Sequence, residues 1–287
     1  MDRVGGCLRW ASQRLSAARI PSPTDEARLL LADALQTTIA SVMAHPERVL
    51  LHDQRRRFES YVDRRTALEP VAYIVGHREF YGLDFMVTPD VLIPRPETEL
   101  LVERGLAKAE ALLAIKGRDL VVADLGTGSG AVAVALVAGQ PQLKVIAVDR
   151  SVRALEVAKE NAARHQVTDR IEFIHGNLLR GITVALDLLV ANLPYISSDE
   201  VPRLMPDVSQ YEPHEALDGG PDGTVLIRRA LEQSAGLMAS PCSLLFEIGD
   251  GQGDQLCRHA RGVFPEAEIG VDRDYAGFER ILSIDLR

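Results

Sequence analysis

The stretch "DLVVADLGTGSGAVAVAL" (residues 119–136) decides the fold. Its first half is a continuous apolar run, which is typical of a strand buried on both faces of a sheet. Its second half predicts a helix, and Gly126, Gly128 and Gly130 lie between the two. Glycine lets the backbone turn sharply and approach a ligand closely, and the N-terminus of a helix offers free N–H groups. The stretch therefore predicts a strand–loop–helix unit that binds a ligand at its loop.

From about residue 98 to the end, strand-like and helix-like segments alternate. The further strand-like runs are "KVIAVD", "RIEFIHG", "ALDLLVAN", "SLLFEIG", "EAEIGVD" and "ERILSIDL". This alternation predicts an α/β fold with a doubly wound, mainly parallel sheet of seven strands. The last two runs can pair as an antiparallel hairpin at one edge.

The rest of the chain has a different character. Residues 1–75 show helical periodicity without strand signals, which predicts a small bundle of four or five helices. Residues 76–97 contain aromatic and β-branched residues with Gly82 as a turn signal, which predicts a β-hairpin connector. Residues 98–287 then form the α/β domain.

Composition and charge exclude several classes of protein. With 46% hydrophobic and 25% charged residues, the 287-residue chain has an ordinary globular composition. No apolar stretch is long enough to span a bilayer and the N-terminus has no signal-peptide core, so we expect a cytoplasmic protein without membrane contact. Three widely spaced cysteines and seven histidines show no metal-ligand spacing, so no metal is expected.

A net charge of −9 argues against duplex DNA as the partner. One segment, "RRRFESYVDRR" (residues 55–65), is locally basic. It is interpreted either as a solvated helix face or as a docking surface for an acidic or RNA-associated partner. Its arginines are Arg55, Arg56, Arg57, Arg64 and Arg65.

Two acidic residues narrow the choice of ligand. Asp149 ends the strand after the glycine loop, where a carboxylate suits the two hydroxyls of an adenosine ribose. The glycine pattern also satisfies the loose fingerprint of dinucleotide sites, so an NAD-dependent oxidoreductase stays open. Asp124, just before the first glycine, favours a ligand with a cationic amino acid part, and hence S-adenosylmethionine. The candidate cofactor residues are Gly126, Thr127, Gly128, Ser129, Gly130, Asp149, Asn177, Leu178 and Asn192.

The tetrapeptide Asn-Leu-Pro-Tyr (residues 192–195) follows the strand-like run "ALDLLVAN". The amide oxygen of Asn192 and the carbonyl of Leu193 can accept both hydrogens of a planar NH2 group, which would aim its nitrogen at an electrophilic methyl carbon. Pro194 stiffens the loop, and Tyr195 can stack on the substrate. These four residues are the candidate catalytic and substrate-binding residues.

The tetrapeptide resembles the Asn-Pro-Pro-Tyr motif of methyltransferases that act on planar amino nitrogens. Around it, "LIPRPETELLVE", "DLGTGSGAVAVAL", "YEPHEALDGGPDG" and "LLFEIGDGQGDQL" resemble the HemK family. These are protein-(glutamine-N5) methyltransferases that modify peptide chain release factors. The resemblance covers nearly the whole chain, helical N-terminal part included.

The resemblance implies a class I methyltransferase sheet and methyl transfer from S-adenosylmethionine, with S-adenosylhomocysteine as product. The implied acceptor is the glutamine amide in the Gly-Gly-Gln motif of class 1 peptide chain release factors. We expect the N-terminal bundle to dock the release factor and the enzyme to be a monomer. A glutamine methyltransferase for a large-subunit ribosomal protein and an adenine-N6 nucleic-acid methyltransferase are the alternatives. The family usually has proline where this chain has Leu193. Because Leu193 precedes Pro194 and keeps its carbonyl, we expect activity to survive and the position to matter only through that carbonyl.

Overall fold

The computed structural model describes residues 3–287, which form two compact units. The smaller unit comprises residues up to His77 together with Met205–Tyr211. The larger unit comprises Arg78–Leu204 and Glu212–Arg287. The short segment 205–211, which the sequence pattern assigns to the α/β domain, therefore packs with the N-terminal helices.

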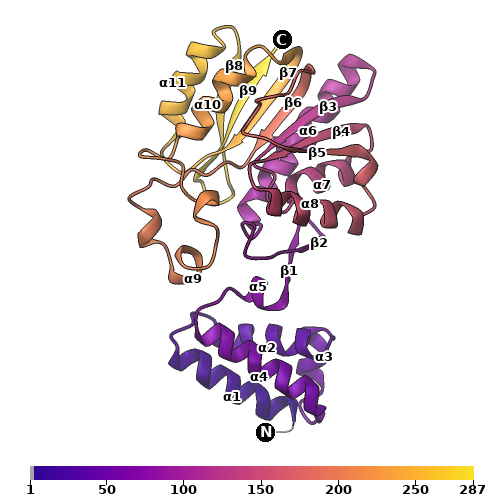
Figure 1. The fold of residues 1–287 in the computed structure, drawn as a ribbon, viewed down its shortest axis with the longest axis vertical. Helices are drawn as coiled ribbons and strands as arrows, with labels where there is room; N and C mark the ends of the chain where they lie inside the picture. Colours follow the sequence, from indigo (N-terminus) through magenta and orange to yellow (C-terminus); the bar gives the residue numbers. More distant parts are fainter. Residues whose placement is uncertain (1–2) are drawn as a thin grey trace. The chain divides into compact units, whose positions relative to one another are not determined.

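A seven-stranded sheet forms the centre of the larger unit (Figure 1), which confirms the predicted fold class. Its strands are β3 (Leu120–Leu125), β4 (Leu143–Asp149), β5 (Ile171–His175), β6 (Leu186–Ala191), β7 (Met238–Glu247), β8 (Glu268–Arg273) and β9 (Glu279–Leu286). They lie in the order β5-β4-β3-β6-β7-β9-β8, and β9 alone among them runs antiparallel to the other six. The predicted hairpin of the last two strands is thus confirmed at one edge.

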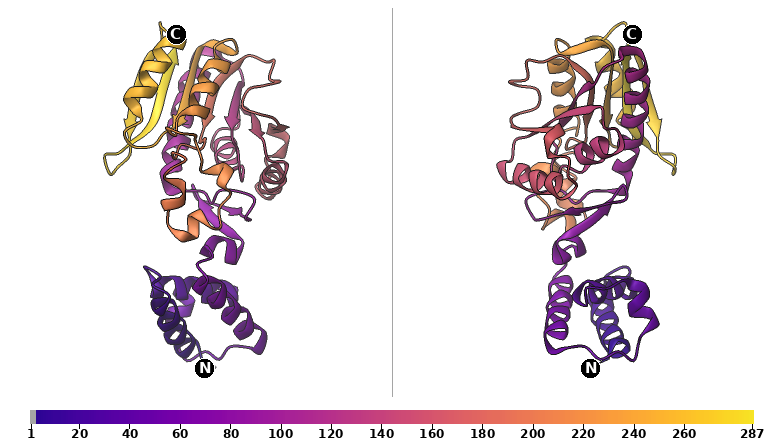
Figure 2. Two further views of the ribbon diagram at one scale, coloured as in Figure 1. Left: turned by 60° about the vertical axis from the view of Figure 1, so that its left-hand side comes forward. Right: turned by 90° about the vertical axis from the view of Figure 1, so that its right-hand side faces the viewer.

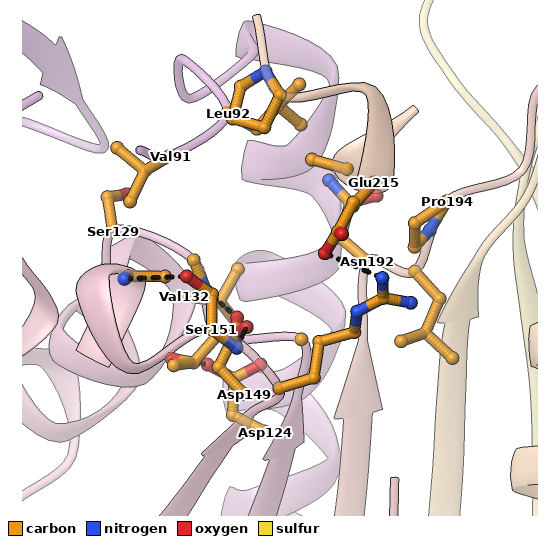
Figure 3. A pocket seen from close by; sticks show the side chains of 18 of the residues that line it. Val91, Leu92, Asp124, Ser129, Val132, Asp149, Ser151, Asn192, Pro194 and Glu215 are labelled. Atoms are coloured by element: carbon orange, nitrogen blue, oxygen red, sulfur yellow. Dashed lines mark hydrogen bonds and ion pairs between the residues drawn. The ribbon is translucent and has the colours of Figure 1, made fainter. Parts of the chain in front are cut away.

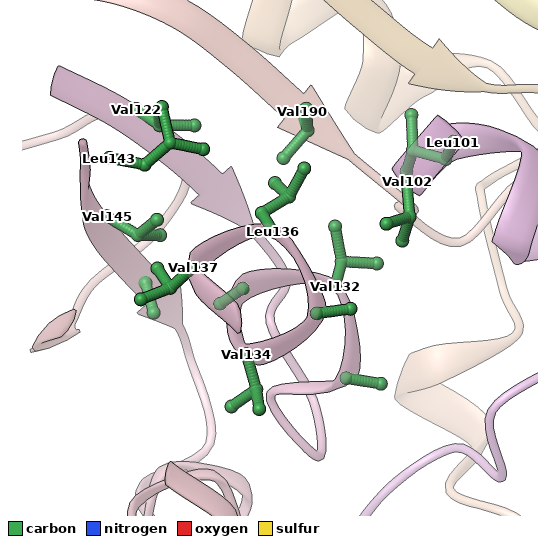
Figure 4. Close-up of a cluster of buried hydrophobic side chains, with 14 of the residues drawn as sticks. Leu101, Val102, Val122, Val132, Val134, Leu136, Val137, Leu143, Val145 and Val190 are labelled. Atoms are coloured by element: carbon green, nitrogen blue, oxygen red, sulfur yellow. The ribbon is translucent and has the colours of Figure 1, made fainter. Parts of the chain in front are cut away.

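Helices cover both faces of this sheet (Figure 2). One face carries α6 (Glu99–Lys116), α7 (Ala131–Gly139) and α8 (Val152–Arg164), and the other carries α10 (Val225–Ser234) and α11 (Gly253–Val263). Figure 4 shows the first layer, where Leu136 and valines of α7 pack between α6 and strands β3, β4 and β6. Because both faces are covered, the central strands are buried along almost their whole length, as their continuous apolar runs predict.

A two-stranded hairpin precedes the large sheet. Its strands β1 (His77–Phe80) and β2 (Leu83–Met86) are joined by Tyr81 and Gly82, whose φ angles of 52° and 73° suit a tight two-residue turn. The buried Asn161 of α8 donates to the carbonyls of Met86 (3.0 Å) and Ser129 (2.9 Å) and accepts from the Met86 N–H (2.7 Å). One side chain therefore ties the end of the hairpin to the glycine loop.

The smaller unit is helical. It consists of α1 (Val4–Ala17), α2 (Pro23–Ala34), α3 (Ile39–Ala44), α4 (His52–Thr66), α5 (Val71–Val75) and the single turn α9 (Pro206–Ser209). Arg65 of α4 is only 4% exposed and pairs with Glu26 (2.6 Å) and Asp207 (3.5 Å). Arg64 pairs with Glu69 at 2.5 Å. The arginine-rich segment is therefore not a uniform basic face, because these members neutralise acidic partners within the unit.

Candidate functional site

A cavity of about 350 Å³ lies at the carboxyl ends of β3, β4 and β6 in the larger unit. Doubly wound sheets bind ligands at this edge. The predicted site residues that line it are Gly126, Thr127, Gly128, Ser129, Asp149, Asn177, Leu178, Asn192, Leu193 and Pro194. Gly130 and Tyr195 are not part of the lining. Figure 3 shows Asp124 and Asp149 close together at their strand ends, with Asn192 and Pro194 on another side of the pocket.

The glycine loop needs Gly130 for packing rather than for ligand contact. Its φ is 79°, and a Cβ atom there would lie 3.1 Å from Cβ of Ala158 in α8. A side chain would therefore strain the backbone and collide with the neighbouring helix. Gly128, two residues earlier, is held by its N–H, which donates to Oδ2 of Asp149 (2.9 Å).

Asp149 has both carboxylate oxygens oriented by the backbone. Oδ2 accepts from Gly128, and Oδ1 accepts from the Ser151 N–H (2.9 Å). A carboxylate offers about four acceptor positions, so each oxygen can accept one more hydrogen bond from a ligand hydroxyl. Burial raises the pKa of Asp149, although the backbone N–H groups oppose that shift.

Asp124 is only 2% exposed, at the base of the cavity. Burial raises the pKa of this carboxyl to about 7, although the Thr127 hydroxyl, which donates to Oδ2 at 2.6 Å, opposes the shift. Because burial disfavours the charged form, a cationic group in the cavity would favour ionised Asp124 and be held by it in turn. Together with the acceptors on Asp149, this environment fits a ligand that has an ammonium group and a ribose.

On the opposite wall, Asn192 directly follows β6. Its Nδ2 donates to Oγ1 of Thr98 (2.9 Å), a buried threonine at the start of α6 that also lines the cavity. That bond engages the amide nitrogen, so Oδ1 is the amide atom of this cavity-lining side chain that can accept a further hydrogen bond. Sequence reasoning missed Thr98, although it lies within the motif "LIPRPETELLVE".

Leu193 contributes more than its carbonyl. Its side chain is 4% exposed, and its Cδ2 atom lies 3.1 Å from where a Cβ of Gly126 would be. The side chain packs directly on the glycine loop, and the expectation that activity depends on this position only through its carbonyl stays a prediction. Leu193 thus joins the two walls of the cavity.

Tyr195 points toward the interior of the unit instead of the cavity. Its hydroxyl donates to Oε1 of Glu247 (3.2 Å), and its ring packs beside the apolar cluster of the α10–α11 face. Its carbonyl accepts from Nε2 of Gln252 (2.9 Å) and lies so close to Gly223 that a Cβ there would be 2.2 Å away. Stacking on a substrate, the role that the sequence suggested, would require this ring to turn.

Two loop motifs meet beside the cavity. Glu212 is buried, forms a short ion pair with Arg95 and accepts from the Ile93 N–H (3.2 Å). This contact joins "LIPRPETELLVE" to "YEPHEALDGGPDG", and Arg95 and Pro213 both line the cavity. The sequence offered no spacing signal for this pair, because its members are 117 positions apart.

Two absences within residues 3–287 concern metal binding and membrane insertion. No group of three or more histidine, cysteine, aspartate or glutamate side chains in this part of the chain could hold a metal ion. None of the helices described there combines the length and hydropathy that crossing a bilayer requires.

The chain matches two family models: the PrmC N-terminal domain over residues 7–76 and the methyltransferase small domain over residues 98–207. It is 41% identical over 274 residues to the release factor glutamine methyltransferase of Moorella thermoacetica, with 95% of each chain covered. The namesake in Cereibacter sphaeroides is 38% identical, with 99% of each chain covered. The chain belongs to the release factor glutamine methyltransferase family.

Solved structures agree with the fold of this family. The hMettl16 catalytic domain, in complex with MAT2A 3'UTR hairpin 6, aligns with a TM-score of 0.56 at 15% identity over 84% of this chain and 85% of that one. A methyltransferase from Pyrococcus furiosus aligns with a TM-score of 0.50 at 15% identity over 82% of this chain and 98% of that one. Family and fold together make the chain a class I methyltransferase with S-adenosylmethionine as methyl donor.

Proposed function

We propose that the chain methylates the side-chain amide nitrogen of the glutamine in the Gly-Gly-Gln motif of class 1 peptide chain release factors. The observation that carries this proposal is the Asn192–Thr98 hydrogen bond, which engages Nδ2 of Asn192, so Oδ1 of this cavity-lining side chain can accept a further hydrogen bond. With the Leu193 carbonyl as a second acceptor, the loop suits a planar NH2 group. Relatives of nearly the same length that are named for release factor glutamine methylation support the same substrate.

The methyl donor would lie against the glycine loop. In this proposal Gly126, Gly128 and Gly130 shape the loop, and Asp149 accepts the ribose hydroxyls. Asn177 accepts from the adenine amino group, and Leu178, which is buried at a φ of 57°, forms an apolar wall. Asp124 attracts the ammonium of the donor. When bound, the donor supplies an electrophilic methyl group on a sulfonium.

The protein contributes mainly positioning. An amide nitrogen is a poor nucleophile because its lone pair is delocalised into the carbonyl. Acceptors at Asn192 and Leu193 orient that nitrogen toward the methyl and favour the positive charge that builds on it. The proton can leave to water after transfer, so no general base is required. The helical smaller unit is the proposed docking module for the release factor.

Incubation with labelled S-adenosylmethionine and purified release factor tests the proposal. Wild-type release factor should take up label, and the Gln→Ala variant of its Gly-Gly-Gln motif should not. Equal labelling of both proteins would place the methyl elsewhere. Labelling of a ribosomal protein or of duplex DNA, with no label in the release factor, would favour one of the alternative substrates.

A further inference from the structure

A buried carboxyl group lies behind the Asn192 loop and is not explained by the proposed chemistry. Glu247 is the last residue of β7, is 1% exposed and does not line the cavity. In the parallel pairing of β6 with β7, Ala191 is opposite Phe246. Asn192 and Glu247 are therefore the next residues of two neighbouring strands, and their side chains emerge on the same face of the sheet.

Thr98 lies on that face, because α6 packs over β6 and β7. The hydroxyl of Thr98 lies near the Glu247 carboxyl and lowers its pKa, although burial raises it more strongly, to about 7. No group in residues 3–287 makes a hydrogen bond of ordinary geometry to Oε2 of Glu247. The Thr98 hydroxyl is a donor that acts on this carboxyl and can supply the hydrogen bond that the buried oxygen lacks.

The direction of the hydrogen bonds follows from this arrangement. A hydroxyl has one proton, so a Thr98 hydroxyl that donates to Glu247 can only accept from Asn192. Such a hydroxyl would pair with Nδ2 of Asn192, which is the bond present in the structure, and Oδ1 is then the end of the amide that Thr98 does not engage. Glu247 also accepts the Tyr195 hydroxyl on Oε1, and it interacts with the Thr98 hydroxyl that binds Asn192.

We propose that Glu247 is a positioning residue that acts through Thr98, so that Oδ1 of Asn192 and not Nδ2 faces the substrate amide. This inference rests on the proposed role of Asn192. A neutral Glu247 could donate its own proton to Thr98, and the freed Thr98 proton would then favour the flipped amide. The ionised form is thus the competent one. The other charged or titratable groups that act on Glu247 are Tyr195, Glu97 of η1 (Pro96–Thr98) and Arg280 of β9.

The test compares the turnover number of four proteins at saturating release factor and cofactor. Thr98→Val, which keeps the shape but removes the hydroxyl, should lower kcat about tenfold, the effect of losing one orienting hydrogen bond. Thr98→Ser should restore most of the rate. Thr183→Val, at an exposed threonine outside the site, is the matched control. Calorimetric affinity for S-adenosylhomocysteine should stay unchanged in all of them, which shows that each variant is folded.

The decisive step repeats Thr98→Val in an Asn192→Ala background. There the substitution should cost almost nothing, because the amide that Thr98 orients is gone. An equal loss of kcat in both backgrounds would overturn the proposed action of Glu247 through Thr98. A Thr98→Ser variant as slow as Thr98→Val would overturn it too. The wild-type kcat should decline below about pH 7, where Glu247 becomes protonated. Glu247→Gln should lower kcat and flatten that decline. An unchanged pH profile in this variant would show that Glu247 does not position Thr98. Wild-type labelling of the release factor is measured separately, so failure of this positioning role leaves the proposed function intact.

Discussion

The glycine-loop wall (residues 124–130 with Asp149) and the acceptor wall (residues 192–194 with Thr98) face one cavity but are built in different ways. Each has a carboxyl whose pKa burial raises to about 7. Asp124 belongs to the cavity lining, whereas Glu247 lies behind the acceptor wall. Protonation of the first should therefore change ligand affinity, and protonation of the second should change the rate of the bound complex.

The largest expected effect on the rate comes from the acceptor wall. Asn192→Ala should lower kcat about 10²-fold or more, as removal of other preorganised hydrogen-bonding groups does. Affinity for S-adenosylhomocysteine should change far less, because the glycine-loop wall is intact. Single-turnover kinetics beside calorimetry separate the two quantities. An unchanged rate would contradict the assignment of Asn192 as an acceptor for the substrate amide.

Asp149→Ala should show the reverse pattern on the glycine-loop wall. Hydrogen bonds to a charged group are worth about 1.5 kcal/mol each at the lower end of their range, so the loss of two should lower affinity for the cofactor about 150-fold. The rate at saturating cofactor should change little. Asp119→Ala, at an exposed aspartate before β3, provides the control. A variant that binds the cofactor normally but has a low kcat would contradict the assignment of cofactor binding to the glycine-loop wall and of catalysis to the acceptor wall.

The pH dependence separates the two carboxyls. Only ionised Asp124 attracts the cationic ligand, so affinity should fall about tenfold between pH 8 and pH 6, and Asp124→Asn should abolish this slope. The free energy of unfolding should change with pH in the opposite direction to the ligand affinity. Both groups have pKa values above those of the unfolded chain, so the folded state binds protons more tightly.

The free energy of unfolding should accordingly decrease as the pH rises from the ordinary carboxyl range to about 7, and saturating cofactor should offset the Asp124 part. Denaturant unfolding at several pH values, with and without S-adenosylhomocysteine, measures this. Stability that falls over the same range in the double variant Asp124→Asn, Glu247→Gln as steeply as in the wild type would contradict the assignment.

The smallest effect on rate is expected at Leu193, where the two walls touch. Leu193→Pro keeps the carbonyl, so single-turnover rates should stay within about tenfold of the wild type. The loss of buried methyl groups against the glycine loop should cost about 1–3 kcal/mol of stability, and Leu193→Ala about 2–5 kcal/mol. A gain in rate of orders of magnitude for Leu193→Pro would mean that the native loop is defective.

Residues that are close in the sequence are those whose place could be predicted. The alternation of apolar runs predicts the sheet, and the glycine loop is recognisable because its strand, turn and helix are consecutive. Asp149 is recognisable too, since the chain returns to the same edge of the sheet after each helix. The neighbouring position of Asn192 follows from the same topology, in which β6 pairs with β3.

The sequence by itself thus determined the fold class, the glycine loop and the strand ends that surround the cavity, because backbone conformation and burial periodicity are local properties. Only the tertiary structure decided that Thr98 binds the Asn192 amide, that Tyr195 turns to Glu247 and that Leu193 packs on Gly126. These contacts join segments separated by long stretches of chain. Which side chains meet there depends on how helices and loops pack over the sheet, and no periodicity in one segment records that packing.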